Sequence, residues 1–217
     1  MDPIFHDRSD AGKKLASELL KYSGEEIAVL GIPRGGVPVA YEIAKGLNAE
    51  ELDVIICRKI PVPLNPEMGF GAVTSNGDTI LNQEVLKRIH IPPEEIIELS
   101  EEVYKEVRRR MGEYRGSRPM PILHDKTVII ADDGMATGFT MVAAIKSVRK
   151  LKPSRVIAAV PAAPRQACDK IREYADDVVT LWCEDADSFA VASFYEEFAD
   201  LSDEEVIRIL DEYGEKL

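Results

Sequence analysis

The chain has 217 residues, of which 45% are hydrophobic, and a formal net charge of −12. This length suits one α/β domain or a domain with an added lobe, and the apolar content is ample for a core. The negative charge opposes nonspecific binding to nucleic acid, whose phosphates it repels, although a local cluster of backbone amides can still hold a small anion.

Further exclusions come from the N-terminus and the cysteines. No stretch is apolar for long enough to cross a membrane, and the first ten residues are charged and lack the apolar core of a signal peptide. Cys57, Cys168 and Cys183 are widely spaced without a Cys-x-x-Cys pair, which argues against a disulfide framework and a zinc site. We therefore expect buried thiols in a reducing cytoplasm and no membrane partner.

The first predicted helix is capped by Ser9 or Asp10 and ends near Gly24. A strand over residues 27–30 then leads into a glycine-rich loop over residues 31–38 and a second helix. Within this loop Arg34 precedes two glycines, and a fixed cation beside free amides suits pyrophosphate. The alternative is a structural turn with an exposed arginine.

A second set of cations, Arg58 and Lys59, follows a strand over residues 53–57. Residues 60–78 are rich in Pro, Gly and Asn and lack a helical period, so we predict a long functional or mobile loop. Residues 82–111 are predicted to be helical, with a break at Pro92-Pro93. Arg108–Arg110 is either a nucleotide or oligomer contact or, as the pattern favours, a solvated helix end.

The most informative stretch is residues 127–140, TVIIADDGMATGFT. A short β-branched strand is followed by Asp132 and Asp133, and small or hydroxylated residues then lead into a helix. Loop amides and a helix N-terminus make an anion site, and the carboxylates can accept hydrogen bonds from hydroxyls or hold a divalent cation through water. The alternative is an ordinary turn with an acidic helix cap.

The remaining chain continues the alternation of strands and helices. Strands are predicted over residues 155–160 and 177–182, an aromatic-rich segment follows, and Ser202–Glu205 forms a capping box for a final helix. This order predicts an α/β fold, with a mostly parallel sheet flanked by helices.

The stretch 127–140 resembles the phosphoribosyl pyrophosphate (PRPP) motif of type I phosphoribosyltransferases. This resemblance implies that Asp132 and Asp133 hold the ribose hydroxyls. It assigns the 5-phosphate to the loop residues Gly134, Met135, Ala136, Thr137, Gly138 and Thr140. Pro33, Arg34, Gly35 and Gly36 are similar to the family's pyrophosphate loop. The resemblance makes Arg34, Arg58 and Lys59 the catalytic cations, and residues 60–78 the loop that closes over them.

The implied function is transfer of a 5-phosphoribosyl group from PRPP to a nitrogen nucleophile, a nucleobase, with release of pyrophosphate, in nucleotide salvage or related metabolism. Mg²⁺ is the expected cofactor, bound through PRPP and water without direct protein ligands. We expect the acceptor near Pro161, Ala162 and Arg165. Because Ala136 stands where 6-oxopurine enzymes often carry Asp, the motif is more similar to the adenine and uracil branches.

The resemblance also sets the expected organisation. We expect one domain over residues 1–217, with a core at about 25–182, a helical insertion at about 82–112 and a small C-terminal lobe at about 183–217. The insertion is either a lobe or a homodimer contact. Over its full length the chain is most similar to a group known only as predicted phosphoribosyltransferases, which shares Asp7–Gly12, P-R-G-G-V-P and R-K-x-x-V-P but identifies no acceptor.

Three other functions remain open from the sequence. The first is a regulatory module that binds PRPP or a nucleotide without turnover. The second is an enzyme that uses the same site for hydrolysis or phosphorolysis, and the third is an assembly partner without activity.

Overall fold

The computed structural model describes residues 3–63, 65–185 and 189–215, so parts of the predicted loop 60–78 and of the predicted C-terminal lobe lie outside the described residues. Its main sheet has five parallel strands in the order β2-β1-β6-β7-β8. These strands are β1 Ile27–Gly31, β2 Glu51–Val54, β6 Thr127–Ala131, β7 Arg155–Pro164 and β8 Asp177–Glu184.

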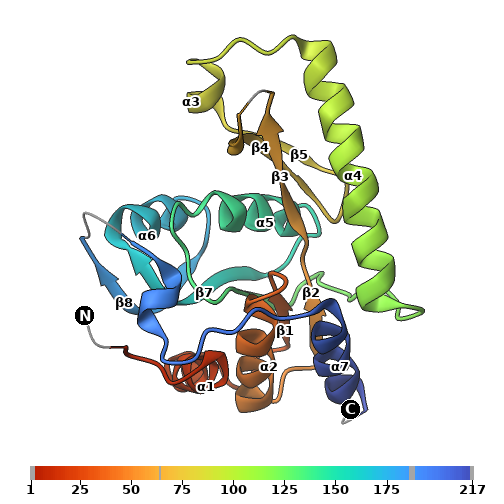
Figure 1. Cartoon of the computed structure of the whole chain (residues 1–217). Coiled ribbons are helices and arrows are strands. Elements are labelled where there is room, and N and C mark those ends of the chain that lie inside the picture. Colours follow the sequence, from red (N-terminus) through yellow and green to blue (C-terminus); the bar gives the residue numbers. More distant parts are fainter. Residues whose placement is uncertain (1–2, 64, 186–188, 216–217) are drawn as a thin grey trace.

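Helices cover both faces of this sheet (Figure 1). On one face lie α1 Arg8–Leu19, α2 Gly36–Leu47 and α7 Asp203–Gly214, and on the other α5 Phe139–Arg149 and α6 Arg165–Arg172. Successive strand residues point to opposite faces of the sheet: Ile129 packs with α1, α2 and α7, whereas Ile130 packs with α5 and α6. The predicted α/β architecture is therefore confirmed.

A second, three-stranded sheet stands beside the first. It consists of β3 Cys57–Val62, β4 Asn65–Thr74 and β5 Thr79–Leu81, in antiparallel pairing. The short helix α3 Gln83–Leu86 and the long helix α4 Pro93–Arg115 follow it, and Figure 1 shows these five elements projecting together from the core. We call β3, β4, β5, α3 and α4 the outer lobe.

The outer lobe corrects two predictions. Much of the predicted loop 60–78 belongs to β3 and β4, which pair as antiparallel strands, and Ile60, Phe70 and Val73 are buried together against α4. The register shifts on either side of Pro61, which is how the pairing tolerates that residue. The strand predicted over residues 53–57 exists with different bounds, since β2 spans Glu51–Val54 and Cys57 already belongs to the second sheet. The break at Pro92-Pro93 is confirmed.

Helix ends agree with the sequence in part. The capping box of Ser202 with Glu205 is present, and Asn48 closes α2 in a left-handed conformation with φ of 51°. The predicted cap of α1 is wrong: Asp7, in extended backbone, accepts a hydrogen bond from the Asp10 amide, so the helix begins earlier. After Leu19 the chain continues as a short 3₁₀ turn, Leu20–Tyr22.

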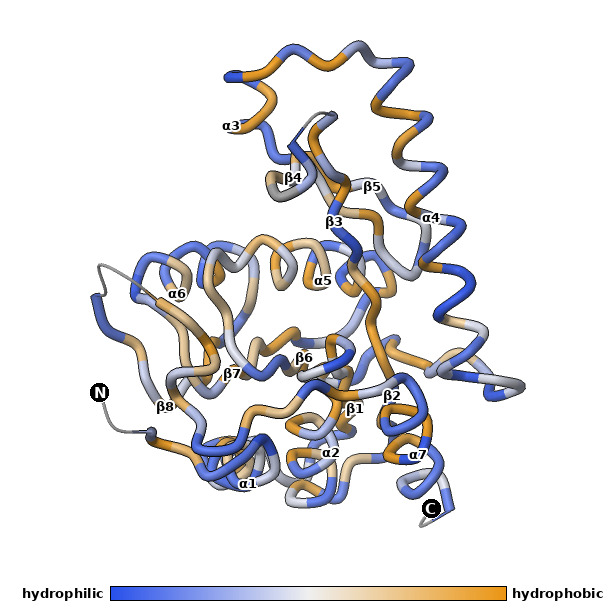
Figure 2. The backbone as a smooth tube through the Cα atoms, viewed as in Figure 1, coloured by the Kyte–Doolittle hydropathy of each residue, from blue (hydrophilic) through white to orange (hydrophobic). Residues whose placement is uncertain are grey.

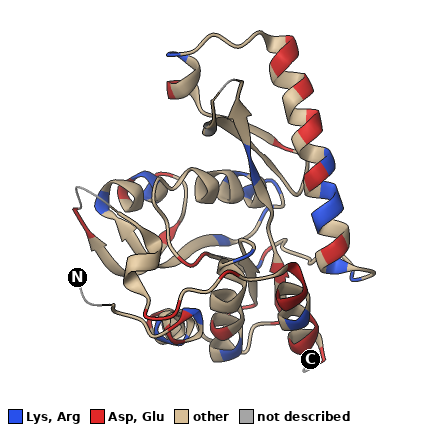
Figure 3. Ribbon diagram, in the orientation of Figure 1, with Lys and Arg blue, Asp and Glu red and all other residues tan. Residues whose placement is uncertain are grey.

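Hydropathy and charge are distributed differently in the two parts. Figure 2 shows hydrophobic residues concentrated along the central strands, whereas α4 alternates hydrophobic and hydrophilic residues along its length. In Figure 3 acidic residues dominate the outer half of α4, and basic residues gather in the half nearer the main sheet. Of the helices in the described residues, none is both long and apolar enough to cross a membrane.

Candidate functional site

Two loops meet at the carboxyl edge of the main sheet. The loop after β1 begins at Ile32, and the acidic pair begins where β6 ends, since Gly31 lies opposite Ala131 in the parallel register. The Ile32 amide donates to the Ala131 carbonyl over 2.8 Å, which ties the loops together. This edge is where ligands bind in open parallel sheets.

Gly35 and Gly36 are required for close packing. A Cβ on Gly35 would come within 1.9 Å of the Asp133 Oδ2, and one on Gly36 within 2.5 Å of the Ala131 carbonyl oxygen. Gly35 has an ordinary helical φ of −61°, so close packing rather than backbone freedom requires a glycine at this position. The diglycine leaves room for the acidic pair.

The acidic pair is largely enclosed by neighbouring segments, and the Asp133 side chain is 15% exposed. Burial raises the pKa of Asp132 well above its usual range, and the charge of Asp133 raises it further. Burial also raises the pKa of Asp133, while the hydrogen bond and charge of Arg8 oppose that rise. The Asp132 carboxylate accepts a hydrogen bond from the Asp133 amide at 2.9 Å. The pair is thus a concentrated negative charge with limited compensation.

Arg8 is a site residue that the sequence analysis left without a role. Its Nε donates to the Asp133 Oδ2 over 2.8 Å, and its Nη1 donates to the Ala199 carbonyl at the same distance. The guanidinium lies 3.8 Å from the centre of the Phe198 ring, and 12% of the side chain is exposed. Tyr195 adds a hydrogen bond of 2.6 Å to the Asp133 carbonyl. The first helix and the C-terminal segment therefore fix Asp133 from both sides.

The predicted phosphate loop runs from Gly134 to the start of α5. Gly138 has a φ of 72°, a left-handed conformation that favours glycine, and it is the N-cap of α5. Ala136, Thr137 and Thr140 are exposed, so their backbone or hydroxyl groups can reach a ligand. The positive end of α5 faces the same loop.

Met135 departs from the predicted set of phosphate contacts. Its amide donates to the Ala162 carbonyl over 3.1 Å, and its side chain is buried in the core. It therefore shapes the loop rather than offering a free amide. Gly134 also has a packing role, because a Cβ there would lie 2.5 Å from a methyl group of Val191.

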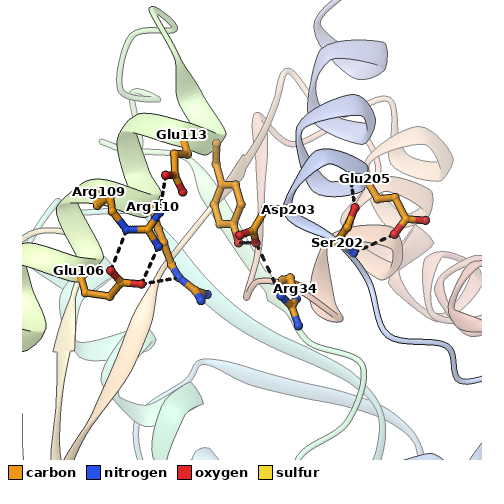
Figure 4. Close-up of polar contacts among 9 residues, drawn as sticks. Arg34, Glu106, Arg109, Arg110, Glu113, Ser202, Asp203 and Glu205 are labelled. Atoms are coloured by element: carbon orange, nitrogen blue, oxygen red, sulfur yellow. Dashed lines mark hydrogen bonds and ion pairs between the residues drawn. The ribbon is translucent and has the colours of Figure 1, made fainter.

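Two of the three predicted cations, Arg58 and Lys59, line a cavity of about 640 Å³ between the core and the outer lobe, whereas Arg34 is not among its lining residues. Arg58 and Lys59 of β3, Pro33 of the first loop and Thr140 of the phosphate loop all line it. Arg34 lies 3.9 Å from the Asp203 carboxylate, which also accepts a hydrogen bond from Tyr114 at 2.5 Å (Figure 4). The structure thus brings residues that are far apart in the sequence to one place.

A model of the family described as phosphoribosyl transferase domain matches residues 4–196. The chain belongs to the phosphoribosyl transferase family. It is similar to the solved structure of TT1426 from Thermus thermophilus, with 37% identity, a TM-score of 0.81 and coverage of 98% of this chain and 99% of that one. The AQ2163 protein from Aquifex aeolicus, 15% identical with a TM-score of 0.50 over 82% of this chain and 76% of that one, shares the fold.

A Mycobacterium tuberculosis protein, Rv0571c of strain H37Rv, is provisionally named a phosphoribosyl transferase and is 40% identical over 208 residues. The match covers 96% of this chain but 46% of that protein, so the chain spans about half the length of the curated relatives it matches. The predicted resemblance to the phosphoribosyl transferase family is therefore confirmed, whereas none of these matches identifies an acceptor for this chain.

The three predicted acceptor residues lie in different surroundings. Pro161 and Ala162 are buried within β7. Arg165 begins α6, lies 3.6 Å from the Asp185 carboxylate, and lines a separate cavity of about 850 Å³ together with Ala136 and Thr137. Their role in binding an acceptor stays a prediction.

The aromatic cluster packs mainly on itself. The rings of Trp182, Phe189 and Phe194 lie 4.7–5.9 Å apart between centres, and Tyr195 contacts Phe5 and Phe198. The cluster therefore packs the C-terminal segment against β7, β8 and the N-terminal segment.

The cysteines are all free thiols. Cys168 is buried, which raises the pKa of its thiol to about 12, and Cys57 and Cys183 are half-buried. The described residues contain no group of three or more His, Cys, Asp or Glu placed to hold a metal ion.

Proposed function

We propose that this protein transfers the 5-phosphoribosyl group of PRPP, with Mg²⁺, to a nitrogen nucleophile, a nucleobase, and releases pyrophosphate. One observation carries the proposal. The enclosed acidic pair and the phosphate loop share a sheet edge with a cavity that Arg58 and Lys59 line. PRPP has the matching pattern of groups: one phosphate, two adjacent hydroxyls and one pyrophosphate.

The ribose 5-phosphate end fits the core loops. The exposed hydroxyls of Thr137 and Thr140 and the N-terminus of α5 favour an anion at the phosphate loop. Asp132 and Asp133 would accept hydrogen bonds from the ribose hydroxyls. Because Arg8 and Tyr195 hold Asp133 in position, the sugar meets groups that need little rearrangement.

The expected Mg²⁺ fits the chemistry of the acidic pair. Two enclosed carboxylates with raised pKa values leave negative charge that a dication nearby would offset. Since two carboxylates make few protein ligands, the ion would arrive with the oxygens of PRPP and keep waters, as Mg²⁺ commonly does. When bound it supplies positive charge to the pyrophosphate oxygens.

The reaction breaks the bond between C1 of the ribose and the pyrophosphate oxygen, which keeps the electron pair. The acceptor nitrogen forms the new bond to C1 and loses its proton. Negative charge grows on the pyrophosphate as the bond breaks, so Arg34, Arg58 and Lys59 would stabilise the leaving group. The protein needs no covalent intermediate, and positioning with electrostatics is sufficient.

The deciding experiment is pyrophosphate release from PRPP and Mg²⁺ across purine, pyrimidine and simple amine acceptors. We expect release that depends on one acceptor. Hypoxanthine and guanine belong in the panel, because Ala136 predicts that neither is the best substrate. A control with the Asp132→Asn/Asp133→Asn double variant should show no release.

Two other results would change the proposal. If no acceptor in the panel gives pyrophosphate release but PRPP still raises the melting temperature, a regulatory module that binds PRPP without turnover is favoured. If pyrophosphate is not released and PRPP does not raise the melting temperature, both the proposal and the regulatory alternative are contradicted.

A further inference from the structure

Helix α4 forms one wall of the cavity that holds Arg58 and Lys59. Its outer half packs on β3 and β4 through Leu99 and Val103, and its last turn is fixed to the core by an ion pair between Arg115 and Asp53. The part of α4 between these anchors carries Glu106 and Arg110, which line the cavity opposite β3. The helix is therefore held in place at both ends of the stretch that faces the site.

Within this stretch, adjacent arginines differ in what they face. Glu106 accepts hydrogen bonds from Arg109 at 2.8 Å and from the Nε of Arg110 at 3.1 Å (Figure 4). Arg109 also pairs with Glu113, is 51% exposed and does not line the cavity. Arg110 is 25% exposed and does line it.

The terminal nitrogens of Arg110 are available for another partner. Across the described part of the chain, its one hydrogen-bonded contact is the Nε donation to Glu106, so Nη1 and Nη2 have no acceptor. In Figure 4 its guanidinium extends past Glu106 toward the side on which Arg34 lies. An arginine in this state can donate two parallel hydrogen bonds to phosphate oxygens.

Two other cations, Arg58 and Arg34, lie in the same region as Arg110. The Glu106 carboxylate has a pKa lowered to about 2, chiefly by its hydrogen bond with Arg109, and the charge of Arg58 contributes. Burial raises the pKa of Tyr114, while the charges of Arg110 and Arg34 both act to lower it. Tyr114 lines the cavity together with Arg110, and its hydroxyl donates to the Asp203 carboxylate, which lies 3.9 Å from Arg34. Glu102 and Glu106 are the carboxylates that face this cluster from α4.

We propose that Arg110 binds the pyrophosphate group of the substrate from the α4 side, opposite Arg58 and Lys59. This inference rests on the proposed transferase function and extends it to the helical insertion. Because Arg58 and Lys59 line the cavity from β3 and Arg110 lines it from α4, a pyrophosphate between them would meet cations on two walls. Of the basic cluster at residues 108–110, the structure selects Arg110 alone as the ligand contact.

The test uses Arg110→Gln with Arg109→Gln as its matched control. Both variants remove one arginine bonded to Glu106, but Arg109 lies outside the cavity. Calorimetry would measure binding of inorganic pyrophosphate in excess MgCl₂ and, separately, of ribose 5-phosphate. We expect Arg110→Gln to weaken pyrophosphate binding about tenfold or more, the scale of a lost charge-assisted hydrogen bond, and to leave ribose 5-phosphate binding unchanged.

The remaining outcomes separate this inference from the proposed function. Unchanged pyrophosphate binding in Arg110→Gln, or an equal loss in Arg109→Gln, would overturn the role of Arg110 and leave the transferase proposal standing. A wild-type protein that binds neither probe would overturn both. Arg110→Lys keeps the charge, so it should recover part of the pyrophosphate affinity if the wild-type residue contacts the anion. A melting temperature that matches the wild type shows that each variant is folded.

Discussion

The two parts of the site are held together by different means. In the core loops the acidic pair is tightly packed: Asp133 has Arg8 on one side and Gly35 directly against it. In the outer lobe Arg58 and Lys59 are exposed, and Arg110 is paired with a carboxylate at a helix surface. Packing fixes the position of the acidic pair, whereas the cations of the outer lobe are exposed or, for Arg110, bound in an ion pair that an anion can replace. We infer that the acidic pair and the phosphate loop position the ribose phosphate, and that the cations of the outer lobe, together with Arg34 of the core, bind the pyrophosphate.

The largest expected effect comes from the acidic pair. Changing Asp132→Asn together with Asp133→Asn removes both acceptors for the ribose hydroxyls, so we expect kcat/KM to fall at least about a hundredfold. Asp125→Asn is the control, because that carboxylate is 81% exposed and precedes β6, at the other end of the strand from the acidic pair. Steady-state kinetics decide the matter, and a double variant within threefold of wild type would contradict the assignment.

A slightly smaller effect should follow from filling the space beside the pair. In Gly35→Ala the new methyl group would occupy the place of the Asp133 carboxylate, so we expect activity to drop by tens of times, with a normal far-UV spectrum. Gly112→Ala on α4 is the control. Its Cβ meets nothing within 4 Å, and it should raise stability by about 0.5–1 kcal/mol. Full activity in Gly35→Ala would show that the core loops are more adaptable than the packing implies.

Removing Arg8 tests how Asp133 is kept charged. Arg8 opposes the rise in the Asp133 pKa, so Arg8→Gln should raise that pKa further. The carboxylate would then bind its proton at higher pH, and the acidic limb of the pH profile of kcat/KM should move to higher pH. We expect about a tenfold loss at neutral pH, the scale of one charge-assisted hydrogen bond.

The control for Arg8 is Lys13→Gln, an exposed cation on the same helix. A uniform loss of activity in Arg8→Gln, with an unmoved acidic limb, would mean that Arg8 only stabilises the fold.

The smallest effect is on stability. The pKa of Asp132 is raised in the folded state, so the folded protein binds this proton more tightly than the unfolded chain does. The resulting stabilisation is complete below the unfolded-state pKa of about 3.8 and is lost as the pH rises through the folded-state pKa. Burial of the Asp132 carboxyl group therefore costs stability at high pH, and Asp132→Asn should raise the melting temperature at pH 8 by about 2–4 °C. The difference should shrink toward acidic pH. A lower melting temperature for the variant at pH 8 would contradict this account.

The sequence predicted the core part of the site better than the lobe. The acidic pair and the diglycine loop each follow a short apolar strand, and that local pattern is sufficient to place them at one sheet edge. Arg8 could not be placed, because it is 125 residues from Asp133 and only the fold joins them. The α1 cap was misplaced because Asp7, Ser9 and Asp10 all have capping side chains.

The hairpin was missed for a related reason. Pro61 and the glycines on either side of Phe70 hide the strand pattern, and the pairing is stabilised by packing of Ile60 and Phe70 beneath α4. The availability of Arg110 also depends on tertiary structure, since three consecutive arginines look alike in the sequence. Long-range contacts therefore decide the parts of the site that local patterns leave open.

The division of the ligand between the two regions can be tested by one set of binding measurements. Ribose 5-phosphate and pyrophosphate, each with Mg²⁺, would be titrated into wild type, Asp132→Asn/Asp133→Asn and Arg58→Gln/Lys59→Gln. We predict a crossover: the acidic-pair variant loses ribose 5-phosphate and keeps pyrophosphate, and the cation variant does the reverse. Loss of both probes in both variants, or of neither, would contradict the division.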